Sequence, residues 1–280
     1  VERANGLAQI EKRNGLAGAP PPPDGPTWTE RGSLNQAGRM HAAAHSPDHA
    51  RLYGGSAMGG VWRGDLDGTG WEPIGDNLYG GAHWLATVAG EGGDVVLAAT
   101  DWGAVHVTED DGVTWDVPAG LGSPWEVRRI LSASDGSETV FALLRGDRGC
   151  WLVRSTDGLQ RFDEVYDLEG YAGDLWTPRD GGGTLYLMTA EGLRWSEDAG
   201  DSWTLAGAPP EGEWSRAQLV GSEAGAPRLW AMVSNDTETH LVRSDDAGGT
   251  WQTTLTEVVD YWSALNASIA DVDLVAWGGV

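Results

Sequence analysis

The sequence is poor in cysteine, in positive charge and in long apolar runs. Cys150 is the only cysteine in 280 residues, so no disulfide can form within the chain. Lysine and arginine together number 18 against 42 aspartates and glutamates, which gives a formal net charge of −24. A charge of that sign repels phosphate and argues against nucleic acid as a partner. No apolar stretch approaches the roughly 18 residues that a membrane span needs, so membrane insertion is not expected.

What the chain does contain is an internal repeat. The eight-residue pattern Ser/Thr-x-Asp-x-Gly-x-Thr/Ser-Trp has every fixed position filled at 108–115, 196–203 and 244–251, and weaker copies lie at 64–71 and 155–162. The aromatic residues that end these segments follow one another at intervals of 44, 47, 41 and 48 residues: Trp71, Trp115, Phe162, Trp203 and Trp251. A fixed period in this range indicates a repeat architecture.

Each repeat also contains apolar runs of strand length. The longer runs, at 95–99, 140–144, 185–188 and 229–233, are rich in Val, Leu and aromatic residues and are bounded by Gly, Asp and Asn. Shorter runs directly precede the repeated pattern. Four strands in a unit of this length make one propeller blade. The sequence therefore predicts an all-β fold, a β-propeller of four-stranded antiparallel blades.

The predicted propeller occupies residues 24–280, and residues 1–23 form a leader that ends in a polyproline spacer. Five complete blades are expected at about 37–77, 80–119, 124–168, 171–207 and 213–258, with part of another at 261–277. The segment around Trp28 is predicted to supply the outer strand of the last blade. The sequence ends where a third strand should begin, which would leave strand edges unpaired. We therefore expect a second polypeptide or a further segment to complete a ring of about six to eight blades.

The repeated pattern has a physical explanation as a stapled turn. Its Ser/Thr and Asp side chains can bond backbone N–H groups inside the turn. Its Gly supplies a backbone angle that other residues resist, and its Trp packs beneath the turn. The residues expected to have this structural role are Thr108, Asp110, Gly112 and Trp115; Ser155 and Asp157; Ser196, Asp198, Gly200 and Trp203; and Ser244, Asp246, Gly248 and Trp251.

This pattern resembles the Asp-box (BNR) repeat shared by sialidases, sortilin-type receptors, photosystem assembly factors and xyloglucan-degrading endoglucanases. The resemblance covers about residues 24–280 and implies a β-propeller. It also implies that the box is structural, because in those families it lies on the turn between the third and fourth strands, away from the binding face.

The binding face of a propeller carries the loops from fourth to first strand and from second to third strand, and here these loops are rich in rings. Aromatic planes can stack on the apolar faces of a sugar while carboxylates bond its hydroxyls. The alternative is that each first-strand Trp packs between neighbouring blades. The candidate ligand-binding residues are Trp84, Trp102, Trp125, Trp176, Trp214, Tyr261, Trp262, Asp101 and Asp174.

No residue is assigned a catalytic role. The xyloglucanase-like families carry a Thr-Asp-x-Gly-Gly-x-Tyr-Arg motif whose Asp is catalytic, and Ala57 stands at that position here. Glycosidases need two carboxyl groups, and Asp101 with Asp174 is one pair that could supply them. A complete sialidase set is absent from the sequence. No cofactor is expected, although Asp65-Leu-Asp67-Gly68 resembles part of a Ca²⁺ loop.

We therefore expect a secreted protein, extracellular or periplasmic and bacterial, that recognises a glycan or a protein through its aromatic and acidic face. The start at Val1 without a signal peptide fits a processed secreted protein. One alternative is a glycoside hydrolase with displaced carboxylates. The other is a structural subunit of an extracellular assembly that another chain completes.

Overall fold

The chain folds into antiparallel sheets of neighbouring strands, as the repeat predicts. The computed structural model describes residues 39–133, 138–168, 170, 172–178, 182–209, 214–223, 228–235, 237–258, 263–268 and 271–279. The predicted leader at 1–23 and the predicted strand around Trp28 lie outside these residues. Within them there are 21 strands and one short 3₁₀ turn, η1 (Asp101–Gly103).

The strands form six successive sheets, in each of which sequence order is also spatial order. The first sheet contains β1 (Met40–His45), β2 (Arg51–Ser56), β3 (Val61–Asp65) and β4 (Glu72–Pro73). The second contains β5 (Ala82–Ala89), β6 (Asp94–Thr100) and β7 (Val105–Thr108). The third contains β8 (Glu126–Ser132), β9 (Val140–Gly146), β10 (Gly149–Ser155) and β11 (Asp163–Leu168).

The remaining sheets repeat this arrangement. The fourth contains β12 (Ala172–Trp176), β13 (Leu185–Thr189), β14 (Gly192–Ser196) and β15 (Thr204–Gly207). The fifth contains β16 (Arg216–Ser222), β17 (Arg228–Ser234), β18 (Glu238–Ser244) and β19 (Gln252–Val258). The sixth pairs β20 (Ser263–Ala267) with β21 (Val275–Gly279). The strand order therefore confirms the all-β fold of antiparallel blades, with four strands in four of the five blades that were expected to be complete, and the segment expected to complete the ring stays a prediction.

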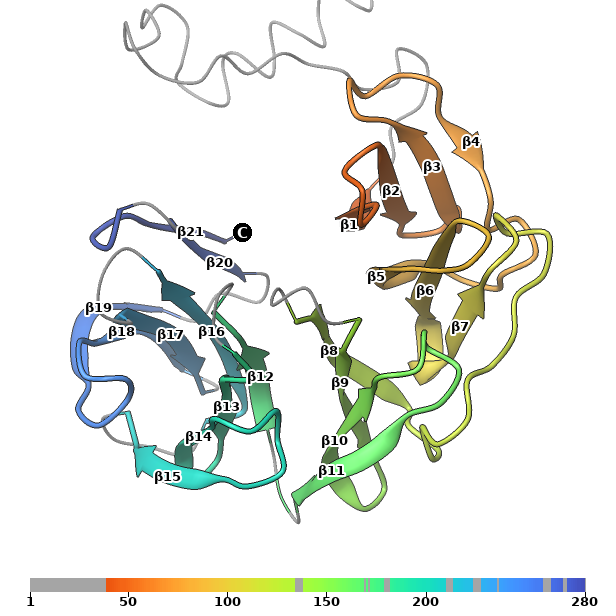
Figure 1. Cartoon of the computed structure of the whole chain (residues 1–280). Helices are drawn as coiled ribbons and strands as arrows, with labels where there is room; N and C mark the ends of the chain where they lie inside the picture. Colours follow the sequence, from red (N-terminus) through yellow and green to blue (C-terminus); the bar gives the residue numbers. More distant parts are fainter. Residues whose placement is uncertain are drawn as a thin grey trace, which may run out of the picture. The chain divides into compact units, whose positions relative to one another are not determined.

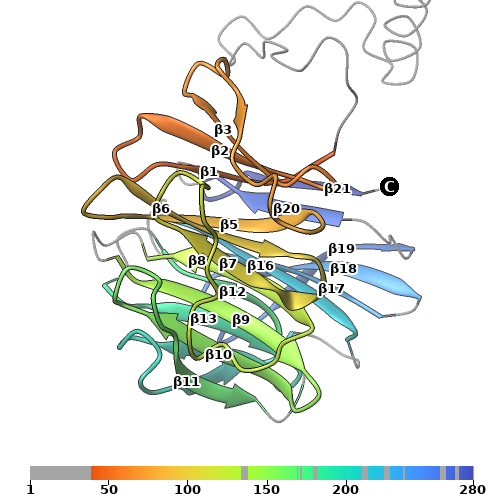
Figure 2. The same ribbon diagram turned by 90° about the vertical axis from the view of Figure 1, so that its right-hand side faces the viewer.

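The first strands of consecutive sheets contact one another: β1 touches β5, β5 touches β8, β8 touches β12, β12 touches β16 and β16 touches β20. The sheets of residues 39–279 thus succeed one another around a common axis, as the blades of a propeller do (Figure 1). Figure 2 views the same strands from the side, where they run roughly along that axis.

The apolar core lies between the blades. The apolar runs identified in the sequence are the second strands β6, β9, β13 and β17, and nearly all of their apolar side chains are buried. One cluster joins Leu97 of the second blade to Trp151 of the third, and another joins Leu143 of the third to Leu187 of the fourth. Because each of these strands is covered on both faces, its sequence is continuously apolar rather than alternating.

The second blade has three strands instead of four. Its expected fourth strand is a single antiparallel bridge between Val107 and Asp116. Pro118 has no N–H to extend the ladder. The chain then pairs with the third blade, where Ala119 accepts the N–H of Phe162 at 2.8 Å.

The repeated pattern forms the same turn at each full copy. The Thr108 hydroxyl accepts the N–H of Gly112 at 2.9 Å, and Asp110 accepts the N–H of Thr114 at 2.8 Å and its hydroxyl at 2.7 Å. The matching bonds occur at 196–202 and 244–250. In the weaker copy, Ser155 Oγ accepts the N–H of Leu159 at 3.2 Å. The hydroxyl and N–H of Ser202 lower the pKa of Asp198 to about 2.

Candidate functional site

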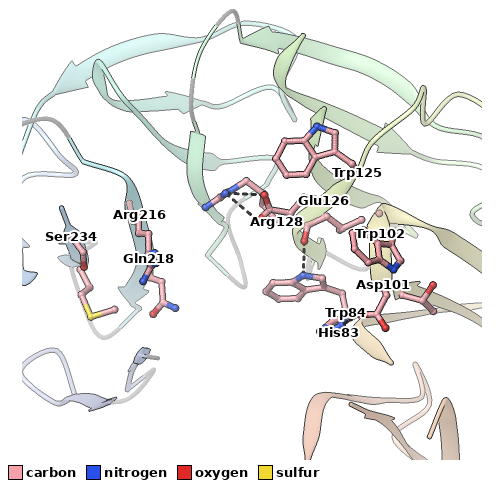
Figure 3. A pocket seen from close by; sticks show the side chains of 15 residues that line it. His83, Trp84, Asp101, Trp102, Trp125, Glu126, Arg128, Arg216, Gln218 and Ser234 are labelled. Carbon is pink, nitrogen blue, oxygen red and sulfur yellow. Dashed lines mark hydrogen bonds and ion pairs between the residues drawn. The ribbon is translucent and has the colours of Figure 1, made fainter. Parts of the chain in front are cut away.

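A cavity of about 570 Å³ opens at the end of the blades where the second strands end, opposite the repeated turns (Figure 3). Its walls come from the second, third and fifth blades. The lining residues are His83, Trp84, Thr100, Asp101, Trp102, Gly103, Trp125, Glu126, Val127, Arg128, Arg216, Ala217, Gln218, Met232 and Ser234. Four of the nine candidate residues are therefore brought together: Trp84, Asp101, Trp102 and Trp125.

Trp102 stands at the rim in a strained conformation. It is the central residue of η1, between β6 and β7, with φ 63° and ψ 26°. This left-handed region is rare for a bulky side chain. The residue is 83 % exposed, and its positive φ, like that of Gly103, is the one that the two central residues of a type I′ hairpin turn adopt. The tight turn between β6 and β7 thus presents the Trp102 side chain to solvent at the cavity rim.

Asp101 begins a series of polar contacts that joins the first two blades. Its carboxylate accepts the N–H of Gly81 at 2.9 Å and contacts Nε2 of His83 at 2.6 Å. Nδ1 of His83 lies 2.6 Å from Nδ1 of His41 on β1. The bonds from Gly81 and then His83 lower the pKa of Asp101. The pKa of His41 is also lowered, chiefly by burial and then by the nearby charges of His83 and Arg39.

Ion pairs cover the third-blade wall. The Glu126 carboxylate accepts hydrogen bonds from Nη1 of Arg128 at 3.2 Å and from Nη1 of Arg145 at 3.4 Å. The Arg145 guanidinium also lies over the Trp125 ring, 4.7 Å from its centroid. One face of this half-exposed ring is therefore covered by a cation, and Trp125 also lines the cavity.

Trp84 is fixed more firmly than the other two rings. Its indole N–H donates to the Val127 carbonyl at 3.0 Å, which ties the second blade to the third. The guanidinium of Arg129 lies 5.3 Å from the centroid of the Trp84 ring. Trp84 thus contributes to the cavity floor and to the contact between blades at once.

The fifth blade forms the opposite wall. Arg216, Gln218 and Ser234 line this side, facing the aromatic residues of the second and third blades (Figure 3). The cavity therefore offers aromatic surface, guanidinium groups and carboxylates together. Such a mixture can hold an extended ligand that has both apolar and polar groups.

Asp174 corrects a prediction. It was expected to face a ligand, but it is only 4 % exposed. Its two oxygens accept the N–H groups of Leu175 and Leu219, each at 2.9 Å, and Nε of Arg129 lies 3.5 Å away. Burial raises the pKa of Asp174, and Arg129 and the N–H bonds oppose that effect. Its bond to Leu219 joins the fourth blade to the fifth, and Asp174 is not among the residues that line the cavity with Asp101.

Two candidate tryptophans pack between blades instead of lining the cavity. Trp176 and Trp214 are half-buried against the core shared by the fourth and fifth blades. The Trp176 ring lies so close to Gly221 that a Cβ there would be 2.2 Å from it. The structure thus places these two rings as the alternative describes, against the core between blades. The remaining candidates, Tyr261 and Trp262, lie outside the described residues.

The candidate ligand-binding residues predicted from the sequence do not include His41, His83 or Arg128, which share one structural position. The register of β1, β5 and β8 against their second strands shifts at these residues. A bulge re-aims the side chain of its extra residue. Gly173 has the same place in β12, and its carbonyl accepts Nε of Arg128 at 3.4 Å. Aligning first strands by the repeat period, instead of aligning only the turns, would have placed these residues in one register.

Within the described part of the chain, no three or more His, Cys, Asp or Glu side chains are grouped so as to hold a metal ion. The Ca²⁺ loop suggested at Asp65 and Asp67 stays a prediction; Asp67 Oδ1 accepts the N–H and hydroxyl of Thr69 at 3.0 and 2.6 Å. A search of the described residues for a helix of sufficient length and hydropathy to cross a membrane finds none.

Sequence comparison finds a distant relative. The chain is 27% identical over 189 residues to the photosystem II assembly lipoprotein Ycf48 of Synechococcus sp. (strain CC9605) and 27% identical over 190 residues to that of Parasynechococcus marenigrum (strain WH8102). Each match covers 63% of this chain and 50% of the relative. The chain thus spans about half the length of the curated relatives it matches. No family model matches the sequence.

Comparison of structures finds β-propellers. The GH74 enzyme of Niastella koreensis superposes with a TM-score of 0.59 at 16% identity, over 76% of this chain and 31% of that one. The GH74 xyloglucanase of Xanthomonas campestris gives 0.56 at 19%, over 75% and 31%. Ycf48 bound to D1 peptide gives 0.53 at 18%, over 79% and 68%. At these identities the likeness shows the fold: the chain is a propeller-type protein.

Proposed function

We propose that this chain belongs to an Asp-box propeller that binds a segment of a partner protein in the cavity between its second, third and fifth blades. The observation that carries the proposal is Trp102, a strained and exposed ring at the cavity rim. A large aromatic side chain that is exposed at a cavity rim is a typical contact residue for a protein partner.

The chemistry of the cavity supports a protein ligand. Trp and Arg are the side chains most enriched where proteins bind one another. Trp102, Trp125 and Arg216 line the same cavity. Two further observations favour this proposal: the sequence relatives are assembly proteins, and the Ycf48 structure with a similar fold holds a D1 peptide.

A glycan is the second candidate ligand. Trp102 and Trp125 could stack on sugar faces, with Asp101 and Gln218 within the same cavity to bond hydroxyls. We place the protein outside the cytoplasm for either ligand, extracellular or periplasmic, because the sequence relatives are lipoproteins.

Panning a random-peptide display library and a polysaccharide array against the chain tests the proposal. We expect peptides to be enriched, and their dissociation constants, measured by calorimetry, to rise ~10-fold or more for Trp102→Ala with Trp125→Ala. Trp71→Ala is the matched control, because Trp71 is an exposed ring at the opposite end of the first blade. Peptide binding that the double variant leaves intact, or binding to polysaccharides alone, would overturn the proposal.

A further inference from the structure

Four large apolar side chains stand exposed at the cavity end of the first three blades. Met58 follows β2 and is 88 % exposed, and Tyr79 precedes β5 and is 86 % exposed. Trp102 and Trp125 at the cavity rim are 83 % and 45 % exposed. All four belong to loops at the end of the blades where second strands finish and first strands begin.

The loops that carry Met58 and Tyr79 are in direct contact. A Cβ on Gly81 would lie 2.0 Å from the carbonyl oxygen of Ala57, a separation that real atoms do not adopt. Gly81 therefore permits the two backbones to touch. Ala57 and Gly81 are within two residues of Met58 and Tyr79, so the loops that carry these two exposed side chains touch one another.

Glycines also join the Tyr79 loop to the cavity rim. A Cβ on Gly80 would lie 2.4 Å from Asp101 Oδ2, and one on Gly103 would lie 2.7 Å from the carbonyl oxygen of Pro124. Both glycines have positive φ, which any other residue would adopt with strain. The four loops thus form one continuous surface, here called the apolar strip: Met58, Tyr79, Trp102 and Trp125.

We infer that the apolar strip is the docking surface for the part of the partner segment that lies outside the cavity, and that this part carries apolar side chains flanked by Lys or Arg. The inference rests on the proposed function and extends it onto the first blade. Met, Tyr and Trp are the apolar types enriched in the centres of protein interfaces, and a flexible Met adapts to partner side chains better than it stacks on sugars.

The negative charge near the strip favours a partner segment that carries Lys or Arg. Asp76, in the Tyr79 loop, and Asp147, which lines a hollow of about 330 Å³ together with Trp125 and Arg145, are exposed carboxylates. No ion pair involving either is found in the part of the chain that the structure describes. With a net charge of −24 on the whole chain, a basic peptide is attracted and an anionic lipid surface is repelled.

The test uses the enriched display peptides as fluorescent probes. We expect their sequences to combine aromatic or aliphatic residues with Lys or Arg. Anisotropy titrations should give dissociation constants ~10-fold higher for Met58→Ser with Tyr79→Ser than for the unmodified chain. Leu66→Ser with Val113→Ser is the matched control, because both residues are exposed at the opposite end of the first two blades and should leave affinity unchanged.

The outcomes separate this inference from the proposed function. If Trp102→Ala with Trp125→Ala weakens binding but Met58→Ser with Tyr79→Ser does not, peptides bind in the cavity without Met58 and Tyr79, and the inference is wrong while the proposed function stands. Enriched peptides that are acidic would also overturn the inference. The last measurement is flotation with phosphatidylcholine vesicles. If vesicle binding depends on Met58 and Tyr79 while peptide affinity does not, the strip binds a membrane surface and the inference is wrong.

Discussion

His41 and His83 face one another through Nδ1 atoms 2.6 Å apart, from the bulges of two consecutive first strands. At that distance one nitrogen donates and the other accepts, so the pair shares a single proton between its facing atoms. On its other side, His83 Nε2 contacts Asp101, the residue before Trp102. The protonation state of the pair is thereby connected to the rim of the cavity.

The first prediction concerns acid sensitivity. The pKa of His41 is lowered from its usual value near 6.5 by burial, by His83 and by Arg39, against a raising effect of Asp101. As pH falls, His41 therefore takes up its proton at a higher pH in the unfolded chain than in the folded chain. The free energy of unfolding consequently falls as pH drops below about 6.5. We expect His41→Asn to flatten this dependence, measured by urea unfolding between about pH 8 and pH 5.

His106→Asn is the matched control for that measurement. Burial alone lowers the pKa of His106, which lies on β7 away from the cavity. The substitution of His106 should therefore also flatten the dependence of the free energy of unfolding on pH. Only His41→Asn should change the pH dependence of peptide affinity, because only His41 is connected to Asp101. Identical affinity curves for the unmodified chain and His41→Asn would show that the pair is uncoupled from the cavity.

The second prediction concerns the repeated turn. Thr108→Val keeps the side-chain shape but removes the hydroxyl that accepts the N–H of Gly112, leaving that buried N–H without its acceptor. We expect a loss of about 1–3 kcal/mol in the free energy of unfolding. Thr108→Ser is the control, since Ser196 and Ser244 make the same bond in the other copies. Equal losses for the two substitutions would show that the hydroxyl bond does not stabilise the turn.

Much of the fold follows from the sequence because the repeated turn is local. The side chain of Asp110 bonds a backbone group four residues away, so its pattern is visible without knowledge of the partner strands. Blade positions then follow from the period. The missing fourth strand of the second blade depended instead on Pro118 and on pairing with the third blade, which is a contact between repeats.

The candidate site was harder to predict because burial and bulges depend on neighbouring blades. Asp174 and Asp101 are both acids at the same end of their blades, yet one is buried against β16 and the other lines the cavity. Nothing in the local sequence separates them. Likewise, the register shift that turns His41 and Arg128 arises from pairing with the second strand.

The third prediction concerns Asp174. Its two oxygens accept N–H groups from Leu175 and Leu219, so Asp174→Asn places an amide NH₂ against one of these donors. We expect the free energy of unfolding to fall by about 1–3 kcal/mol, measured by urea denaturation. Asp201→Asn is the control, because Asp201 forms an exposed ion pair with Arg154 and should cost less than about 1 kcal/mol. Equal costs would show that Asp174 does not join the blades.

The last prediction separates stability from binding at Trp102. Asn adopts left-handed backbone more readily than Trp, so Trp102→Asn relieves strain and should raise the free energy of unfolding by about 1 kcal/mol. The same change removes an exposed ring and should weaken peptide binding. Trp84→Leu, which breaks the bond to Val127, should lower stability. Thermal unfolding and calorimetry measure both quantities. If Trp102→Asn destabilises the chain as Trp84→Leu does, the ring is part of the internal packing and its conformation is no evidence for a ligand.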